Sequence, residues 1–292
     1  VYKRQASTMI ILPRFELAAL MQLINTTKPT VMPAVPTLFN AIMNFPKVKN
    51  HYLRSLKFCI SGGAPLPLAV KRGFEDATGC VVVEGYGLTE ASPVVTCNAT
   101  AGPMREGSIG MPLPQTEVSL RDLDDPARPV PQGEKGEVCV RGPQVMPGYW
   151  QRPEETKAVF TPDGFLRTGD VARMDRDGLF SIEDRIKDLI ICSGYNVYPR
   201  QIEEAIYTHP AVAEVTVIGI GDAYRGEAPK AFIKLKDGGS ASAEDILAHL
   251  ETRLSKIELP TEIEFRDDLP KTMIGKLSKK ELRDLENGSA QN

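Results

Sequence analysis

The sequence contains no apolar run long enough for a transmembrane helix. The best candidate, Met9 to Ile24, is interrupted by Pro13, Arg14 and Glu16, whereas a membrane span needs about 18 or more apolar residues. A large excess of one charge is also absent, because the net charge is −3. This gives no electrostatic reason to expect a nucleic acid or an anionic membrane surface as a partner. We therefore expect a cytoplasmic protein, for which peripheral contact with the inner face of the membrane and the oligomeric state stay open.

The cysteines form no recognisable pair. The five of them (Cys59, Cys80, Cys97, Cys139 and Cys192) are scattered and include no C-x-x-C motif. Such a set is typical of reduced, mostly buried thiols and argues against a disulfide framework or a zinc site. With 42% hydrophobic and 25% charged residues, the 292-residue chain has the composition of a globular protein of one large or two ordinary domains.

The first five residues, Val1 to Gln5, lack an initiator methionine and match the translated end of a sequencing adapter. We interpret them as non-native and exclude them from the fold analysis. On this interpretation the chain begins inside a domain. A genuine basic N-terminal arm is the alternative.

Short strand-like stretches alternate with amphipathic helical stretches over residues 6–106. The expected strands are Met9–Leu12, Thr30–Met32, Leu56–Ile60 and Cys80–Val83, and the expected helices are Leu17–Ile24, Leu38–Met43 and Leu68–Thr78. Pro36 and Thr37 suit the start of the second helix. This alternation predicts an α/β domain with a mainly parallel sheet covered by helices, in which ligands bind at the carboxyl ends of the strands.

The pattern changes twice further along the chain. Residues 107–186 contain short apolar stretches between Gly, Pro and Asp clusters, which predicts a small antiparallel β subdomain. Residues 187–292 form a separate α+β pattern, with a helix started by Pro199 and a cap-like Ser242–Asp245 segment before another helix. We expect a polar loop at Cys192–Asn196, a last strand at Glu262–Phe265 and a last helix at Ser278–Leu285.

Two glycine-rich loops follow expected strands. The first, Ser61–Pro65, has glycines that let the backbone approach a flat ring such as adenine, although most such loops are only tight turns. The second, Glu84–Glu90, combines an aromatic ring that can stack on a base with a Thr hydroxyl for phosphate. Its Glu can hold Mg²⁺ together with phosphate oxygens. A turn with a core Tyr is the alternative interpretation.

Three further candidates are ambiguous by themselves. Asp170 in Thr168-Gly169-Asp170 can accept hydrogen bonds from ribose hydroxyls, but the triplet taken alone is better explained by an Asx turn. Asp184-Arg185 fits a surface ion pair. Lys276 follows a glycine, so that it can reach into a cleft and offset phosphoryl charge, or it belongs to a plain basic face.

The order of the motifs decides between these interpretations. SGGAPLP, GYGLTE, GEVCVRGPQVMPGYW, TGD, DRIKDLIICSGYNVYPRQIEE and LPKTMIGK follow one another between Met9 and Leu285. This series resembles the adenylate-forming (AMP-binding) superfamily. AVPTLF near Val35 and the SGYNVYP form of the fifth motif are most similar to fatty acyl-CoA ligases of the long- or medium-chain type.

The resemblance implies a two-step reaction. A fatty acid and ATP give an acyl-adenylate and pyrophosphate, with Mg²⁺ as cofactor, and the thiol of coenzyme A then takes the acyl group. It also implies two domains, an N-terminal AMP-binding domain, present here only in part as residues 1–186, and a mobile C-terminal domain, residues 187–292.

The resemblance assigns a role to each motif. The adenine site would be formed by Gly62, Gly63, Ala64, Glu84, Gly85, Tyr86 and Gly87, with Tyr86 stacked on the adenine ring. The catalytic residues would be Lys276, Thr89 and Glu90, with Thr89 at the α-phosphate and Glu90 at Mg²⁺. Asp170 would hold the ribose with Arg185 beside it, Lys187 would be the hinge, and Ser193 and Gly194 would line the coenzyme A path.

The chain departs from the family pattern in two places. The family's Ser/Thr/Gly-rich phosphate loop does not occur in these 292 residues, so we expect the chain by itself not to adenylate at a useful rate. Ile191 stands where some luciferases and aryl-CoA ligases have a lysine, which favours the fatty acyl subfamily. Two alternatives remain: an adenylation domain that loads an amino or aryl acid onto a carrier protein, and a non-catalytic nucleotide-binding fragment.

Overall fold

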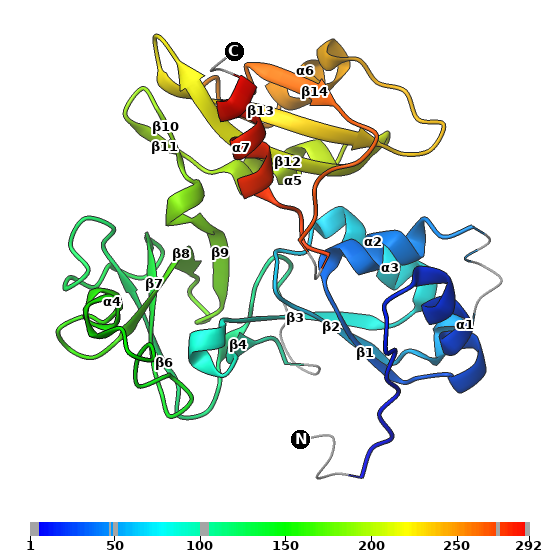
Figure 1. Cartoon of the computed structure of the whole chain (residues 1–292), viewed down its shortest axis with the longest axis horizontal. Helices are drawn as coiled ribbons and strands as arrows, with labels where there is room; N and C mark the ends of the chain where they lie inside the picture. The colour runs from blue at the N-terminus through cyan, green and yellow to red at the C-terminus, as the bar shows by residue number, and fades with distance from the viewer. Residues whose placement is uncertain (1–5, 47, 49–51, 100–104, 273–274, 290–292) are drawn as a thin grey trace.

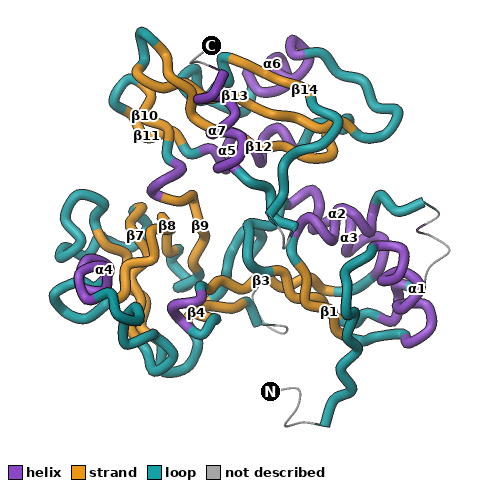
Figure 2. The backbone as a smooth tube through the Cα atoms, viewed as in Figure 1, coloured by secondary structure: helices purple, strands orange, loops and turns teal. Residues whose placement is uncertain are grey.

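The computed structural model describes residues 6–46, 48, 52–99, 105–272 and 275–289 (Figure 1). The strands of these residues form three sheets, which Figure 2 shows as separate groups. We name the parts by their sheets. The N-terminal lobe extends from α1 to β5, the β subdomain from β6 to β9, and the C-terminal lobe from β10 to α7.

The sheet of the N-terminal lobe is parallel at its centre. β1 (Val31–Ala34), β2 (Phe58–Ser61) and β3 (Val81–Gly87) pair in parallel, with Met32, Cys59 and Val82 side by side. β4 (Val94–Cys97) and the short β5 (Met111–Pro112) extend it as antiparallel strands. The expected α/β class is therefore confirmed, with the parallel strands in the order of the sequence.

The helices α1 (Leu17–Thr27), α2 (Pro36–Met43) and α3 (Leu68–Thr78) share one core with this sheet. α2 and α3 connect successive parallel strands in the same direction, so right-handed crossovers bring both to one face. Phe39 of α2 and Phe74 of α3 are fully buried and meet edge to face at 4.9 Å between ring centroids. This packing fixes the loops that leave β2 and β3.

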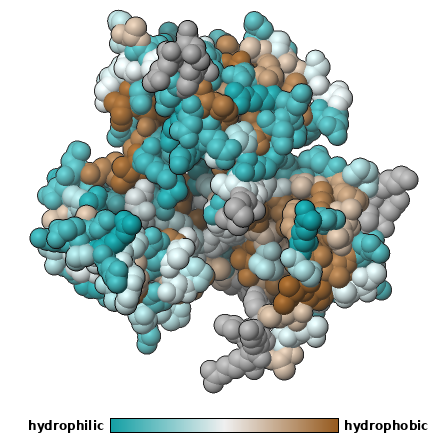
Figure 3. All heavy atoms as spheres, viewed as in Figure 1, coloured by the Kyte–Doolittle hydropathy of each residue, from teal (hydrophilic) through white to brown (hydrophobic). Residues whose placement is uncertain are grey.

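The expected strand at Met9–Leu12 is wrong. These residues form no regular structure, and Ile11 is 72% exposed. An isolated strand has no neighbour to satisfy its backbone groups, and within the described residues β1 pairs with β2 alone. Apolar surface gathers over the part of the molecule that carries α1, whereas the β subdomain is mostly hydrophilic in the same view (Figure 3).

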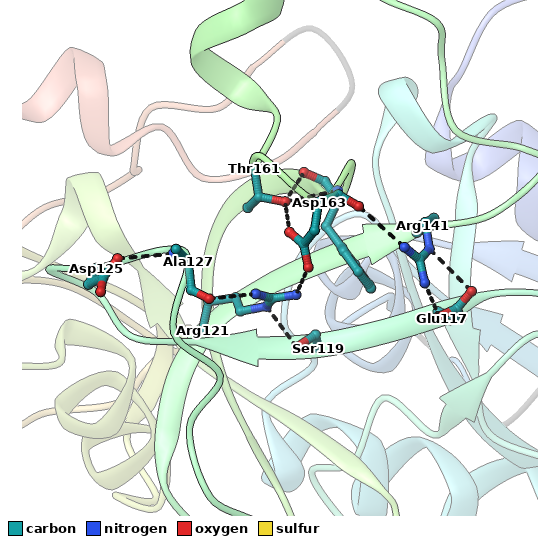
Figure 4. Close-up of polar contacts among 9 residues, drawn as sticks. Glu117, Ser119, Arg121, Asp125, Ala127, Arg141, Thr161 and Asp163 are labelled. Atoms are coloured by element: carbon teal, nitrogen blue, oxygen red, sulfur yellow. Dashed lines mark hydrogen bonds and ion pairs between the residues drawn. The ribbon is translucent and has the colours of Figure 1, made fainter.

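The β subdomain is an antiparallel four-stranded sheet, as expected. Its strands β6 (Glu117–Arg121), β7 (Lys135–Arg141), β8 (Leu166–Met174) and β9 (Phe180–Arg185) pair in sequence order, and α4 (Pro153–Val159) lies beside β8. Buried Arg121 fixes the loops of this sheet by donating to Ser119 Oγ at 2.9 Å, to the Ala127 carbonyl at 3.0 Å and to Asp163 at 2.6 Å (Figure 4). Arg141 also forms an ion pair, with Glu117 at 2.6 Å (Figure 4).

The C-terminal lobe contains a second mixed sheet in the order β11-β10-β13-β12, with β14 beside β13. The strands are β10 (Ile190–Cys192), β11 (Tyr195–Val197), β12 (Val212–Asp222), β13 (Gly226–Leu235) and β14 (Glu262–Phe265). The helices are α5 (Pro199–Tyr207), α6 (Ala243–Glu251) and α7 (Lys279–Ser289). Ser242 and Asp245 form the expected capping box at the start of α6.

Cys192–Asn196 was expected to be a polar loop, but it forms the tip of a β-hairpin. β10 and β11 are joined by Ser193 and Gly194, whose φ angles are +53° and +83°. Two consecutive positive φ values define a tight turn that matches the twist of the paired strands. The segment is therefore shorter and more ordered than its composition suggests.

The 3-10 turn Ile186–Asp188 follows β9 and leads into the C-terminal lobe. Its buried Asp188 accepts from Arg283 of α7 at 2.8 Å. Lys187 therefore lies at the junction of the two parts, and movement of residues 187–292 about it stays a prediction. Among the described residues, no helix combines the length and apolar character needed to cross a bilayer.

Candidate active site

The two glycine-rich loops lie side by side at the carboxyl ends of β2 and β3. A Cβ on Gly62 would lie 3.8 Å from the carbonyl oxygen of Gly85. The loops line a cleft of about 580 Å³, to which the β subdomain contributes Asp170 and Arg185 and the C-terminal lobe contributes Lys276. Its position is the one at which open parallel sheets bind ligands.

The backbone at Gly87 leaves no room for a side chain. A Cβ there would lie 1.9 Å from the carbonyl oxygen of Pro93, which itself accepts from the Leu88 amide at 2.8 Å. This close approach holds the strand end rigid and directs Tyr86 into the cleft wall, where its ring packs against the core of the β subdomain. The glycine is thus required locally, apart from any ligand.

Asp170 connects the N-terminal lobe to the β subdomain. Its carboxylate accepts from the Tyr86 hydroxyl at 2.6 Å and from Arg185 Nε at 3.1 Å. Burial raises the pKa of the Asp170 carboxyl, and the Tyr86 hydroxyl and Arg185 guanidinium oppose this shift. Burial and the neighbouring Asp170 raise the pKa of Tyr86 in turn, so this hydroxyl stays a donor.

An Asx turn does not account for Asp170. The turn is closed by Thr168, whose hydroxyl accepts from the Asp170 amide at 3.1 Å, and by buried Glu137, which accepts from the Gly169 amide at 3.1 Å. The Asp170 carboxylate is left to face the cleft. An ionised carboxylate has about four acceptor positions, so two protein donors leave capacity for further donors from a ligand.

Glu90 and Thr89 also line the cleft. Tyr149 donates to Glu90 Oε1 at 2.9 Å, and the Met146 amide donates to the Glu90 carbonyl at 2.7 Å. The described residues contain no group of three or more His, Cys, Asp or Glu side chains that could hold a metal ion. One carboxylate nevertheless suits Mg²⁺, which commonly binds one or two carboxylates together with substrate phosphates and water.

Lys276 enters the cleft from the C-terminal lobe and lies over the first glycine-rich loop. A Cβ on Gly63 would meet Lys276 Cε at 3.0 Å and Nζ at 3.1 Å. Burial lowers the pKa of the Lys276 ammonium, and the neighbouring Arg185 lowers it further. The Lys276 cation is thus placed among Asp170, Arg185 and the loop glycines, and it does not belong to a solvated basic face.

The candidate residues divide into three groups. Gly63, Ala64, Thr89, Glu90, Asp170, Arg185, Lys276 and the run from Glu84 to Gly87 line the cleft. Lys187 instead lines a second cavity of about 390 Å³ between the N-terminal and C-terminal lobes. Gly62, Ser193 and Gly194 line neither space. The structure therefore brings the motif of Lys276 to the cleft, but not the hairpin of Ser193 and Gly194.

Three cleft residues were not anticipated. Tyr149 stands in the GPQVMPGYW motif, yet the sequence alone assigns it no contact with Glu90. Glu137 stands in GEVCVRGPQVMPGYW and Arg200 in DRIKDLIICSGYNVYPRQIEE, but the sequence assigns neither a contact in the cleft. Arg200 lines both spaces, and its amide donates to buried Asp184 at 2.8 Å. Asp184 also accepts from the Arg185 amide at 2.8 Å, so the Asp184-Arg185 pair is not a surface ion pair.

An α/β lobe, a β subdomain and a C-terminal lobe that delivers a lysine to a shared cleft define a nucleotide-binding class of enzyme fold. The family model of the AMP-binding enzyme matches residues 4–150, and that of the AMP-binding enzyme C-terminal domain matches residues 201–276. The chain belongs to the AMP-binding enzyme family.

Curated relatives agree with this assignment. A long-chain-fatty-acid–CoA ligase of Bacillus subtilis (strain 168) is 46% identical over 274 residues, which are 94% of this chain and 49% of the relative. The chain thus spans about half the length of the curated relatives it matches. The anthranilate CoA ligase AuaEII, solved with anthranoyl-AMP, superimposes with a TM-score of 0.91 at 31% identity over 98% of this chain and 56% of that one.

MatB from Rhodopseudomonas palustris has been solved in two states. The ATP-bound structure matches with a TM-score of 0.87 at 34% identity, and the apo structure with 0.72 at 35% identity, each over 96% of this chain and 55% of MatB. The arrangement of the present structure is therefore closer to the ATP-bound MatB than to the apo form.

Proposed function

We propose that this chain is the nucleotide-handling and domain-moving part of a fatty acid–CoA ligase of the long- or medium-chain type. The observation that carries the proposal is the contact of Lys276 with Gly63, inside the cleft that also contains Asp170 and Glu90. This combination of a partly buried cation, a ribose-type acceptor and a metal-type carboxylate suits a nucleotide polyphosphate.

In the first step, a carboxylate attacks the α-phosphorus of ATP and pyrophosphate leaves. Gly62, Gly63 and Ala64, with Glu84, Gly85 and Gly87, would border the adenine, and Tyr86 would stack on it. Asp170 would accept from the ribose hydroxyls, with Arg185 holding its carboxylate in place at 3.1 Å. Thr89 would donate to the α-phosphate, and the Lys276 ammonium would offset the negative charge that grows on the phosphoryl oxygens.

Glu90 would hold Mg²⁺, which supplies charge neutralisation at the phosphates. The Tyr149 hydroxyl, 2.9 Å from Glu90 Oε1, keeps that carboxylate oriented towards the cleft. Mg²⁺ fits this position because it commonly binds a single protein carboxylate together with substrate phosphates.

In the second step, the coenzyme A thiol attacks the acyl carbonyl and AMP leaves. Ser193 and Gly194 would line the path of the thiol after residues 187–292 turn about Lys187. In the present arrangement this hairpin lies outside the cleft, as rotation between two productive positions requires. The arrangement therefore corresponds to the adenylation step.

The relatives favour a fatty acid as the substrate. Several long-chain-fatty-acid–CoA ligases are 42–46% identical to this chain, whereas feruloyl-CoA synthases are 39% identical. Ile191 in place of a lysine points the same way. An aryl acid is the second candidate, favoured by the resemblance to the anthranilate CoA ligase.

We further propose that the 292-residue chain does not form acyl-adenylate by itself. The β- and γ-phosphates need a cradle of Ser, Thr and backbone donors, and no such loop stands in this sequence. Exchange of pyrophosphate into ATP by the chain alone would contradict this proposal.

The test is a chimeric ligase in which the amino-terminal half of the Bacillus subtilis relative precedes this chain. With palmitate, ATP and coenzyme A, Lys276→Ala should slow acyl-adenylate formation by on the order of 10²-fold, because a charge-stabilising donor is lost. Thioester formation from supplied palmitoyl-adenylate should continue. Lys280→Ala, which removes a neighbouring lysine, is the matched control, and equal damage to both steps by Lys276→Ala would overturn the assignment.

A further inference from the structure

Thr37 occupies the second position of α2, yet its hydroxyl does not cap that helix. The N-cap residue Val35 makes no side-chain cap bond, and Thr37 Oγ1 instead donates to the carbonyl of Gly275 at 2.6 Å. Gly275 immediately precedes Lys276. The N-terminal lobe thus holds the lysine loop by a side chain that serves no local purpose in its own helix.

Asn40 makes the same kind of contact one turn later on α2. Its Nδ2 donates to the carbonyl of Ala213 at 2.9 Å, while its Oδ1 accepts from Asn44 Nδ2 at 3.0 Å. The second bond fixes which way the carboxamide faces. Ala213 lies in β12, so α2 is tied to the C-terminal lobe at two separated points, as the descending loop and the position of α2 in Figure 1 indicate.

A third contact closes the interface from α3. The amide of Leu68, the first residue of that helix, donates to Glu204 Oε2 of α5 at 3.3 Å. A first-turn amide has no acceptor within its own helix. Protection of this amide from solvent exchange therefore depends on the C-terminal lobe being in place.

We propose that Thr37 and Asn40 are positioning residues that form a latch, which holds the C-terminal lobe in the arrangement that places Lys276 over Gly63. Both acceptors are main-chain carbonyls, so the specificity of the latch lies wholly in the α2 side chains. Rotation of the lobe breaks both bonds together and leaves each group free to bond water. The inference rests on the proposed function only for the role of Lys276. The latch itself concerns the position of the C-terminal lobe, whatever reaction the protein performs.

The experiment measures amide hydrogen exchange in the 292-residue chain, residue by residue, by nuclear magnetic resonance. Loss of one hydrogen bond of ordinary net strength changes an opening equilibrium by about five-fold. Thr37→Val, which keeps the branched shape and removes the hydroxyl, should raise the exchange rate of the Leu68 amide by about that factor. Thr37→Val combined with Asn40→Leu should raise it by about 20-fold or more, since the two bonds add.

Three controls separate the latch from a general loosening. Thr37→Ser keeps a hydroxyl and should restore slow exchange at Leu68. Thr27→Val removes a helical hydroxyl that bonds within α1, to the Leu23 carbonyl at 2.7 Å, and should leave Leu68 unchanged. The Lys71 amide, bonded within α3 to the Pro67 carbonyl at 3.0 Å, should keep its exchange rate in every variant.

Unchanged exchange at Leu68 in Thr37→Val overturns the latch, and so does an equal rise at Lys71 or in Thr37→Ser. These outcomes do not depend on any enzymatic assay. If Lys276→Ala fails to slow acyl-adenylate formation in the chimeric ligase, the proposed function falls while an exchange result in favour of the latch still stands.

Discussion

Replacing Gly63 by alanine tests whether Lys276 lies where its proposed catalytic role requires. The added Cβ would lie 3.0 Å from Lys276 Cε and 3.1 Å from Nζ, so the lysine end must move by a few tenths of an ångström. The φ angle of Gly63 is +82°, which costs an L residue about 1–2 kcal/mol. Forcing the lysine away from its rotamer adds roughly 0.5–1 kcal/mol.

Gly79→Ala supplies the matched control. Gly79 has a φ angle of +74° at the end of α3, and a Cβ there meets no described atom within 4 Å. It therefore carries the backbone strain without the crowding. In urea unfolding of the 292-residue chain, we expect Gly79→Ala to lower the free energy of unfolding by about 1–2 kcal/mol, and Gly63→Ala to lower it by about 0.5–1 kcal/mol more.

The decisive comparison is made in a Lys276→Ala background. There the nearest atom to a Cβ on Gly63, once the end of Lys276 is gone, would be Val35 Cγ1 at 3.9 Å, an ordinary contact. The extra cost of Gly63→Ala should then disappear, whereas the cost of Gly79→Ala should stay the same, because residues out of contact contribute additively. If Gly63→Ala costs the same with and without Lys276, the lysine does not occupy the cleft and the reasoning is refuted.

Two further predictions concern the separate steps in the chimeric ligase. Gly194→Leu places a branched side chain at a φ angle of +83° on the hairpin tip, and it should slow thioester formation from supplied acyl-adenylate while sparing acyl-adenylate formation; normal thioester formation in this variant would contradict the role of the hairpin. Because burial and Arg185 lower the pKa of Lys276, acyl-adenylate formation should decline with rising pH earlier than an exposed lysine would allow. Arg185→Gln should move that decline to higher pH, and a pH profile unaffected by Arg185→Gln would argue against Lys276 as the titrating group. The same shift means that the folded chain gains stability as pH rises through this range, since the unfolded chain then binds more protons.

Local patterns predicted the elements whose signals are complete within a few residues. The helix Leu68–Thr78 and the strand Glu262–Phe265 have the expected bounds, and Ser242 with Asp245 forms the expected cap. Met9–Leu12 reads as a strand by composition, but a strand exists only where a neighbour pairs with it. Sequence alone does not report that neighbour.

The cleft was predicted through the order of its motifs and not through any single one. Tyr86 and Asp170 are 84 residues apart and meet through one hydrogen bond, for which neither motif contains a signal. Thr37 is the clearest case, because its position suits a helix start while its hydroxyl bonds a carbonyl 238 residues away. The side chains of Tyr149 and Glu137 were missed for the same reason, since their partners are set by tertiary contact.

In the proposed function, the modest strength of the interface between the lobes would allow one cleft to serve two steps. The hydrogen bonds of Thr37, Asn40 and Leu68 each contribute roughly 1 kcal/mol net, so together they favour the present arrangement by about 3 kcal/mol, or a population ratio on the order of 10². A polyanionic ligand that contacts Lys276 adds to this preference, because Lys276 lies in the cleft only in the present arrangement. Reversing a 99:1 preference requires about 5.5 kcal/mol of differential binding, which has to come from a ligand that binds the other arrangement more tightly. A much larger apolar interface would fix the lobe and leave the hairpin of Ser193 and Gly194 permanently outside the cleft. An interface made of a few hydrogen bonds would hold the lysine in place and still release it.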